Sequence, residues 1–398
     1  MANAGRILII PRGDYNRNTT YEMLDLVSYN DASWLAKKTV KGIDPSDANS
    51  EYWFKMMCES TSPLPISKGG TGANTALTAL ANLGITDYVT PQMFGAKADG
   101  VTDDSDAIQS AINSLPSRGG TVYFPAGTYI ITKQIDIGDG DHASTPSTKN
   151  AIRLIGASSA RCGSNVGVEI KPSTSLTTPL DRIFHVHGRI NNVSIENFSL
   201  YCDGRAKIGL CINACSQSEF KNIVIYNPTY CGLYLGGGKE VTENYCIHNL
   251  FSNISVSLAT SNTIGLEMTG NVSANTSCWL TKFECCRFQS MSNTTNCTSA
   301  SLKFADSCTF VRCHFVTYSS TGRGVEFNSK NNANFPCGMA FYDCSIINTV
   351  VSEGTTAKIR PNYFIGFGTH DGEIIPTHEK LIGITDTGVP FNGWGTSS

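Results

Sequence analysis

A short pattern of apolar residues recurs from the middle of the sequence onward. The unit is apolar-x-polar-apolar-x-apolar, and successive copies start 25 to 32 residues apart. Repeats of this length are typical of a solenoid, in which each repeat forms one coil stacked on its neighbour. The six copies begin at Ile195, Phe220, Phe251, Phe283, Phe310 and Phe341.

A second apolar segment follows within most repeats, often directly after a glycine. Two strands per coil, with inward side chains at every second position, predict an all-β fold, a parallel β-helix whose equivalent residues stack about 4.8 Å apart. The phenylalanines that open the repeats would form an internal aromatic ladder, with Cys286, Cys313 and Cys344 stacked beside it. The outward residues of the second segments would be Cys211, Tyr234, Glu267, Lys303 and Glu326.

The stretch before the repeats predicts one capping helix and the first strands. Thr102 or Asp103 can cap an amphipathic helix, which Pro116 and the following glycines end. Strand-like alternation follows, interrupted by a Pro-Ala-Gly turn that leads into Thr128 and Tyr129. A shorter helix is expected from Ala76 to Leu83, after a Gly-rich string.

This order of helix, Gly-Gly, strand and Pro-Ala-Gly-Thr-Tyr resembles the entry segment of the pectate-lyase-like superfamily. These proteins are right-handed parallel β-helices and include many phage tailspikes. The string Ser67-Lys68-Gly69-Gly70-Thr71-Gly72-Ala73 is similar to a segment that recurs in phage tail fibres, and the aromatic start of the chain is similar to small chitin-binding-like modules of such fibres.

The resemblance implies a phage tail receptor-binding protein, a tailspike or tail fibre. Such a protein would bind a bacterial surface polysaccharide, with or without depolymerising it. It would be a homotrimer in the virion tail, assembled in the bacterial cytoplasm beside other tail or baseplate proteins. The alternatives are a non-catalytic structural fibre or adhesin and, disfavoured by the fibre-like first 85 residues, a free-standing pectinase.

Four segments are expected along the chain. Residues 1–60 would form a small aromatic β-module that binds carbohydrate or attaches to the virion, and residues 61–87 a Gly-rich connector. Residues 88–352 would form the β-helix. Residues 353–398 break the repeat and would form a C-terminal cap or an intersubunit region.

Composition and charge exclude several partners. Charged residues make up 16% of the chain, against roughly 25% in an average soluble domain, and the net charge is −3 without a basic cluster. We therefore expect no nucleic-acid partner. No apolar run approaches a membrane span or a signal peptide, so neither membrane insertion nor Sec-type secretion is expected. The 15 cysteines include no CxxC pair, so reduced core thiols are expected.

Four carboxylates are candidate catalytic residues of a glycoside hydrolase or lyase. Glu267 and Glu326 should lie two coils apart with Lys303 between them, and glycoside hydrolysis needs two such carboxylates. Asp203 and Glu284 should lie on a neighbouring face. A column of alternating charge is also what a solvated face would show. The sequence therefore leaves open whether the protein is an enzyme.

Four aromatic residues are candidate carbohydrate platforms: Trp34, Trp53, Tyr201 and Tyr234. Aromatic rings can stack on sugar rings, but a small module also needs its tryptophans to fill its core. Both interpretations stay open for the two tryptophans.

No metal ion or cofactor is expected. The run of Asp99, Asp103, Asp104 and Asp106 lacks the ligand spacing of an EF-hand, and helix capping explains it better. His185 and His187 alternate along a strand and should face one side, but no third ligand accompanies them in the sequence.

Overall fold

The computed structural model describes residues 8–58, 66, 70–138, 149–159, 167–236, 246–270, 277–318, 321–328, 339–347, 349–353 and 363–365. The chain divides into two compact units, Met1–Gly84 and Ile85–Ser398. Within the described ranges no helix has the length and apolarity to cross a membrane. Most of the predicted C-terminal segment, residues 353–398, lies outside the described residues.

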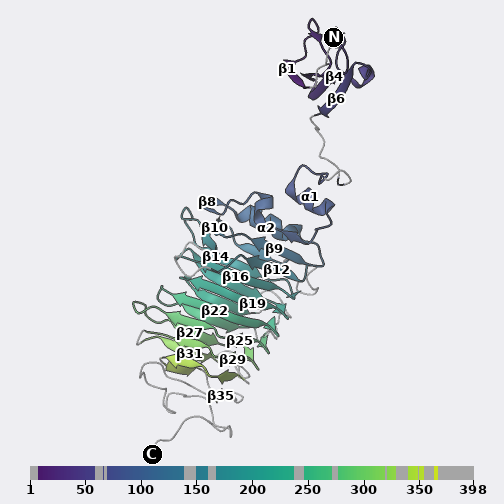
Figure 1. The fold of residues 1–398 in the computed structure, drawn as a ribbon. Coiled ribbons are helices and arrows are strands. Elements are labelled where there is room, and N and C mark those ends of the chain that lie inside the picture. Colours follow the sequence, from purple (N-terminus) through teal and green to yellow (C-terminus); the bar gives the residue numbers. More distant parts are fainter. Residues whose placement is uncertain are drawn as a thin grey trace, which may run out of the picture. The chain divides into compact units, whose positions relative to one another are not determined.

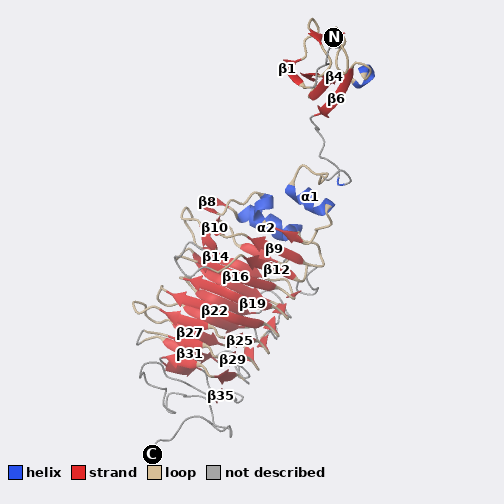
Figure 2. Cartoon of the chain, in the orientation of Figure 1, coloured by secondary structure: helices blue, strands red, loops and turns tan. Residues whose placement is uncertain are grey.

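The first unit contains a small β-module (Figure 2). Its main sheet has the order β1-β3-β4-β6. Strands β2 and β5 form a separate, two-stranded antiparallel sheet. Tyr21, Trp34 and Trp53 are buried in its core, where Tyr15 contacts Trp53 edge to face. The elements are β1 (Ile10–Asp14), β2 (Thr20–Tyr21), β3 (Asp25–Tyr29), β4 (Ala32–Ala36), β5 (Val40–Lys41), η1 (Asp47–Asn49), β6 (Trp53–Cys58) and, after the Gly-rich string, α1 (Ala76–Asn82).

The second unit is a right-handed parallel β-helix, whose stacked strands appear in Figure 1, and the predicted fold class is confirmed. Its largest sheet has 16 strands, all paired in parallel. These are β7 (Tyr88–Val89), β8 (Asp99–Asp103), β9 (Gly120–Phe124), β10 (Gly127–Ile131), β12 (Ile152–Gly156), β13 (Val168–Pro172), β16 (Ser194–Tyr201), β19 (Glu219–Tyr226), β22 (Leu250–Leu258), β25 (Lys282–Glu284), β26 (Arg287–Ser290), β29 (Thr309–Val311), β30 (His314–Val316), β32 (Ala340–Tyr342), β33 (Ser345–Ile347) and β35 (Tyr363–Ile365).

Two further parallel sheets complete the coils. The eight-stranded sheet comprises β11 (Ile135–Ile137), β14 (Leu180–Val186), β17 (Ala206–Asn213), β20 (Cys231–Gly236), β23 (Ile264–Thr269), β27 (Thr298–Leu302), β31 (Arg323–Asn328) and β34 (Thr349–Glu353). The five-stranded sheet comprises β15 (Ile190–Asn191), β18 (Cys215–Ser216), β21 (Cys246–Ile247), β24 (Cys278–Trp279) and β28 (Ala305–Asp306).

The predicted aromatic ladder is present inside the β-helix. The ring of Phe251 stacks on Phe220 and on Phe283 with centroids 4.8 Å apart, and the stack continues through Phe310 to Phe341. The thiols of Cys286, Cys313 and Cys344 are buried, and each donates to a main-chain oxygen of a ladder phenylalanine in the preceding coil. The repeat register derived from these residues is confirmed, because Phe220 pairs with Phe251 and Phe251 with Phe283.

The first strand of successive coils is bent at a residue whose backbone is in the left-handed conformation, and these residues stack in a column. Asn197, Asn222 and Asn253 have φ of 67°, 53° and 55°, a conformation that Asn tolerates better than most residues. Their side chains form a ladder, since Asn253 donates to Asn222 and Asn222 donates to Asn197. These bends turn the strand without losing the parallel pairing on either side.

Glycines allow two sheets to approach closely where the second strand of a coil begins. A Cβ atom added to Gly232 would lie 2.3 Å from Val256, and one added to Gly209 would lie 2.4 Å from Ile225. No side chain fits at these distances, which explains why glycine recurs within the second strand of successive repeats, at Gly209 in β17 and Gly232 in β20.

One helix closes the N-terminal end of the β-helix. The helix α2 (Ser105–Ser114) follows η3 (Pro91–Phe94) and packs on it, with Ile108, Ala111 and Ile112 buried. The predicted helix is confirmed, but its N-cap is Asp104, whereas Thr102 or Asp103 was expected. The reason is that Asp103 ends strand β8 and its carboxylate accepts from the main-chain nitrogen of Ser105 instead.

Candidate functional site

The outward side chains of the eight-stranded sheet form one column, which we call the outer column. The alternate residues of the same strands, such as Leu210, Leu233 and Leu266, point into the core. Strand pairing places the members of the outer column in direct register from one strand to the next. They are Asp136, His185, Cys211, Tyr234, Glu267, Ser301 and Glu326.

Glu267 is the most enclosed carboxylate of the outer column, with 2% of its surface exposed. Lys303 forms an ion pair with it, and the hydroxyl of Tyr230 donates to its other oxygen. Burial, together with the hydrogen bond to Glu267, raises the pKa of Tyr230 well above its usual range. Tyr230 therefore keeps its proton at neutral pH and remains a donor to this carboxylate.

Glu326 has its own set of partners, and 7% of its surface is exposed. Nη1 of Arg323 lies 2.6 Å from one carboxylate oxygen, and Oγ of Ser301 donates to the other at 2.9 Å. Ser301 separates Glu326 from Glu267 in the column. The two carboxylates are therefore two coils apart, as the repeat predicted.

The expected place of Lys303 in the outer column is wrong. The sequence suggested that Leu302 aligns with Leu266, but Leu302 pairs with Met268, a shift of two residues. Strand β27 ends at Leu302, so Lys303 lies just beyond the strand and its amine turns back to Glu267.

The other two predicted acids are not brought to this site. Glu284 belongs to β25 in the 16-stranded sheet and forms an ion pair with Lys282. Asp203 is exposed in the turn between β16 and β17, with φ of 49°. Neither residue lies in the outer column.

The four predicted aromatic platforms have different environments. Trp34 and Trp53 are buried in the core of the N-terminal module, with exposures of 4% and 1%, so neither ring face is open to a sugar. Tyr201 is also buried, and the amine of Lys171 lies 4.6 Å from its ring centroid. Tyr234 is the one placed in the outer column, where it is partly exposed beside a small apolar cluster.

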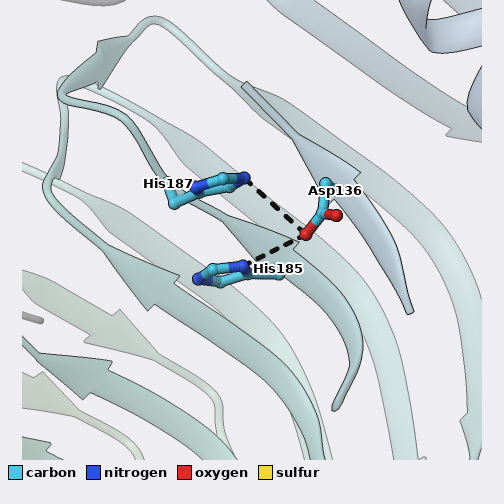
Figure 3. Close-up of side chains that lie close together, drawn as sticks. All are labelled: Asp136, His185 and His187. Atoms are coloured by element: carbon cyan, nitrogen blue, oxygen red, sulfur yellow. Dashed lines mark hydrogen bonds and ion pairs between the residues drawn. The ribbon is translucent and has the colours of Figure 1, made fainter. Parts of the chain in front are cut away.

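The structure places a third group beside His185 and His187, a group that the sequence did not predict (Figure 3). The two imidazole rings stack with centroids 4.1 Å apart and planes 6° from parallel. Oδ1 of Asp136 lies 3.2 Å from Nδ1 of His185 and 3.6 Å from Nε2 of His187. Both histidines are buried, whereas the Asp136 side chain is 39% exposed.

Neighbouring groups hold this cluster in place. Gln109 of α2 forms two hydrogen bonds with the main chain of Asp136, and the amide of Gln134 donates to its Oδ1 at 2.8 Å. Nη1 of Arg182 lies 2.9 Å from Nε2 of His185. Because a guanidinium group only donates, this nitrogen accepts, and the neutral ring donates from Nδ1 to Asp136.

Burial and nearby charges shift the pKa values of His185 and Asp136. Burial lowers the pKa of His185, and the charges of His187 and Arg182 act in the same direction against the hydrogen bond with Asp136. Burial would raise the pKa of Asp136, but the hydrogen bond from His185 and the nearby imidazoles outweigh it, so this pKa is lowered. The resting pair is a neutral imidazole and a carboxylate.

A polar pocket of about 470 Å³ opens beside this cluster. Such a volume lies within the range of small-molecule sites. The pocket lies where α2 meets the start of the eight-stranded sheet, so it adjoins one end of the outer column. Its lining includes Gln109, Asn113, Lys133, Gln134, Asp136 and His187.

Comparison with known sequences identifies one family. The family described as rhamnogalacturonase A/epimerase, pectate lyase-like, matches residues 90–309. This range includes the helix α2, the His–Asp cluster and Glu267, but it ends before Glu326.

Individual relatives cover shorter parts of the chain. Depolymerase 1, capsule K30/K69-specific, of Klebsiella phage K5-2 is 40% identical over 103 residues, which are 23% of this chain and 12% of the relative. The preneck appendage protein of Bacillus phage PZA is 27% identical over 176 residues, 40% of this chain and 20% of the relative. The chain thus spans a fifth or less of the length of these curated relatives.

A solved structure from Geobacillus virus E2, ORF18, aligns with 88% of this chain and 70% of its own, with 17% identity and a TM-score of 0.43.

Proposed function

Since the chain belongs to the rhamnogalacturonase A/epimerase, pectate-lyase-like family, we propose that it is a phage tail receptor-binding protein of the tailspike type. Its ligand would be a polysaccharide of the bacterial surface. Two relatives, a phage capsule depolymerase and a phage preneck appendage protein, support this assignment.

One structural observation carries the proposal, namely the continuous outer column on a single sheet. The column from Asp136 to Glu326 crosses seven strands in register. At about 4.8 Å per strand it extends over roughly 29 Å. A linear glycan lying along the β-helix axis would contact the partly exposed side chains of Asp136 and Tyr234 directly. It would reach the buried Glu267 and Glu326 only when the side chains that cover them move.

The outer column also contains a pair of groups for cleavage. Glu267 and Glu326 are two strands apart, about 9.6 Å along the column. Inverting glycosidases hold their acid and base roughly 6.5 to 9.5 Å apart, with room for a water molecule between sugar and base. We propose inverting hydrolysis as the reaction, with these two residues as acid and base.

A second function, a non-catalytic adhesin, is favoured by a different observation. Each of the two carboxylates is already held by a cation, Glu267 by Lys303 and Glu326 by Arg323. A carboxylate oxygen that binds a cation is less accessible to a sugar or a water molecule, whereas hydrolysis needs both carboxylates beside the scissile bond. In an adhesin the same column would bind the glycan without cutting it.

Incubation with polysaccharide extracted from candidate hosts distinguishes the two functions. The fragment size and the number of new reducing ends would be followed over time. Fragmentation that is lost in both Glu267→Gln and Glu326→Gln would support hydrolysis. Binding without any new reducing ends would support the adhesin and remove both residues from the catalytic role.

We also propose the assembly and location that tailspikes have: a homotrimer in the virion tail, in contact with other tail or baseplate proteins. The first 60 residues would provide the attachment. Three copies give multivalent binding to a repetitive glycan, which raises the overall affinity. Light scattering of the full chain tests this, since a monomeric mass at micromolar concentration would contradict it.

A further inference from the structure

We propose that Asp136, His185 and His187 form a binding site for one divalent transition-metal ion of the zinc type. The three residues each offer one ligand atom, and these atoms lie within 4.8 Å of one another. Two imidazole nitrogens and one carboxylate oxygen are a common ligand set for zinc. The site is independent of Glu267 and Glu326.

The separations between the ligand atoms are close to those of a metal site. Ligands placed 2.0–2.1 Å from zinc at the corners of a tetrahedron are about 3.3 Å apart. Oδ1 of Asp136 is 3.2 Å from Nδ1 of His185 and 3.6 Å from Nε2 of His187. The longer distance exceeds that of a hydrogen bond. One carboxylate oxygen therefore faces two ring nitrogens at close to ligand spacing. Because the two rings are stacked with planes 6° from parallel, one imidazole must rotate to direct its nitrogen lone pair at a shared ion.

The surrounding groups can orient each ligand. Gln134 donates to the same oxygen of Asp136, and Gln109 fixes the main chain of this residue. Asn213 can offer its carbonyl oxygen to Nε2 of His185 at 3.2 Å while its amide donates to two main-chain oxygens. A histidine that binds metal through one nitrogen usually donates from the other. Asn213 supplies the acceptor for that bond.

Arg182 and a metal ion favour opposite tautomers of His185. Without metal, Nε2 of His185 accepts from Arg182 and Nδ1 carries the proton. Metal binding at Nδ1 requires that proton to leave, and Nε2 must then donate to Asn213 while Arg182 turns away. Removing the guanidinium should therefore increase the affinity for metal.

The fourth coordination position would face the polar pocket beside the cluster. Asp136 and His187 both line that pocket, together with the amides of Gln109, Asn113 and Gln134. A water molecule, or a hydroxyl group of a bound sugar, could occupy the position. The site thus has the open coordination that distinguishes a ligand-binding metal centre from a closed structural one.

Binding of Zn²⁺ and Co²⁺ to the full chain tests the proposal. Among the cysteines that the structure describes, Cys285 has an exposed thiol, which would also bind these ions, so a Cys285→Ser background removes it. We expect one zinc ion per chain by calorimetry, affinity reduced at least about tenfold in His187→Gln and in Asp136→Asn, and affinity increased in Arg182→Met. His314→Gln, which removes an exposed histidine elsewhere, should bind as the background does.

The visible spectrum of the Co²⁺ form provides a readout that does not depend on activity. Nitrogen and oxygen ligands should give d–d bands, and these should disappear in His187→Gln. If that variant does not fold, Asp136→Asn provides the same comparison, since it keeps the shape of a side chain that is partly exposed. The proposal is overturned by zinc affinity that is equal in background and variants, by a thiolate charge-transfer band, or by a preference for Ca²⁺ over Zn²⁺.

Discussion

The hydroxyl of Tyr230 donates a hydrogen bond to Glu267, the fourth residue of β23. Tyr230 directly precedes β20, the strand that pairs with β23. This contact orients one oxygen of the carboxylate, while Lys303 holds the other. A buried carboxylate with two fixed partners has little freedom to rotate. Glu267 is therefore the best-positioned acid in the outer column.

Replacing Glu267 by Gln keeps the shape of the side chain and removes its charge. We expect cleavage of polysaccharide to be lost, because the amide cannot serve as acid or base, while the fold is retained. The loss of the ion pair with Lys303 should cost less than about 2 kcal/mol. A reducing-end assay and a thermal melt measure the two effects. Glu219→Gln, an exposed glutamate paired with Lys221, is the matched control, and full activity of Glu267→Gln would exclude the catalytic role.

Phe283 lies in the middle of the aromatic ladder, between Phe251 and Phe310. Truncation to Ala would leave a cavity that the rigid coils above and below cannot fill. We expect Phe283→Ala to lower the free energy of unfolding by about 3 to 5 kcal/mol. Urea unfolding followed by far-UV circular dichroism measures this loss. A transition identical to that of the wild type would show that the ladder does not stabilise the β-helix.

Asp103 connects the start of α2 to the adjacent coil by accepting hydrogen bonds from Ser105 and Thr132. Burial would raise its pKa, but these hydrogen bonds outweigh burial and lower it. A lowered pKa contributes stability above the unfolded pKa of about 3.9, and this contribution disappears as pH falls through the folded value.

Asp103→Asn should therefore destabilise the β-helix at pH 7, by less than about 1 kcal/mol because solvent screens this exposed carboxylate. The difference from wild type should shrink below about pH 4. Denaturant unfolding at several pH values measures it, with the exposed Asp87→Asn as control. A difference that stays constant down to pH 2 would mean that the charge of Asp103 is not what stabilises the cap.

The register of the aromatic ladder could be predicted because a phenylalanine marks almost every coil. Because these large inward phenylalanines recur at the same position of each coil, a wrong alignment of two strands would place a phenylalanine out of line with the others. Strand β27 lacks such a marker. Its inward residue Ala300 is small, and the alternation of Leu302 with Phe304 beyond the strand imitates the pattern of the other coils. This alternation predicts a place in the outer column for Lys303, whereas the structure has Ser301 there.

The His–Asp cluster could not be found by spacing along the chain. Asp136 is 49 residues before His185, and the coil between them does not follow the repeat length of the later coils. The available signal was the similarity of Ile135-Asp136-Ile137 to Phe184-His185-Val186, two apolar-polar-apolar triplets that pair in register.

Deciding whether Trp34 and Trp53 are core residues or sugar platforms also needed the three-dimensional structure, since both roles use the same side chain.

Binding of surface polysaccharide along the outer column is the central claim, and Tyr234 tests it most directly. Biolayer interferometry would compare wild type with Tyr234→Ala and with Tyr342→Ala, which truncates an exposed tyrosine of the 16-stranded sheet. Loss of an aromatic residue that anchors a ligand costs more than about 1 kcal/mol. We predict binding by the wild type, affinity at least about fivefold weaker in Tyr234→Ala, and no change in Tyr342→Ala. Absence of binding by the wild type, or a loss confined to Tyr342→Ala, would contradict the proposed site.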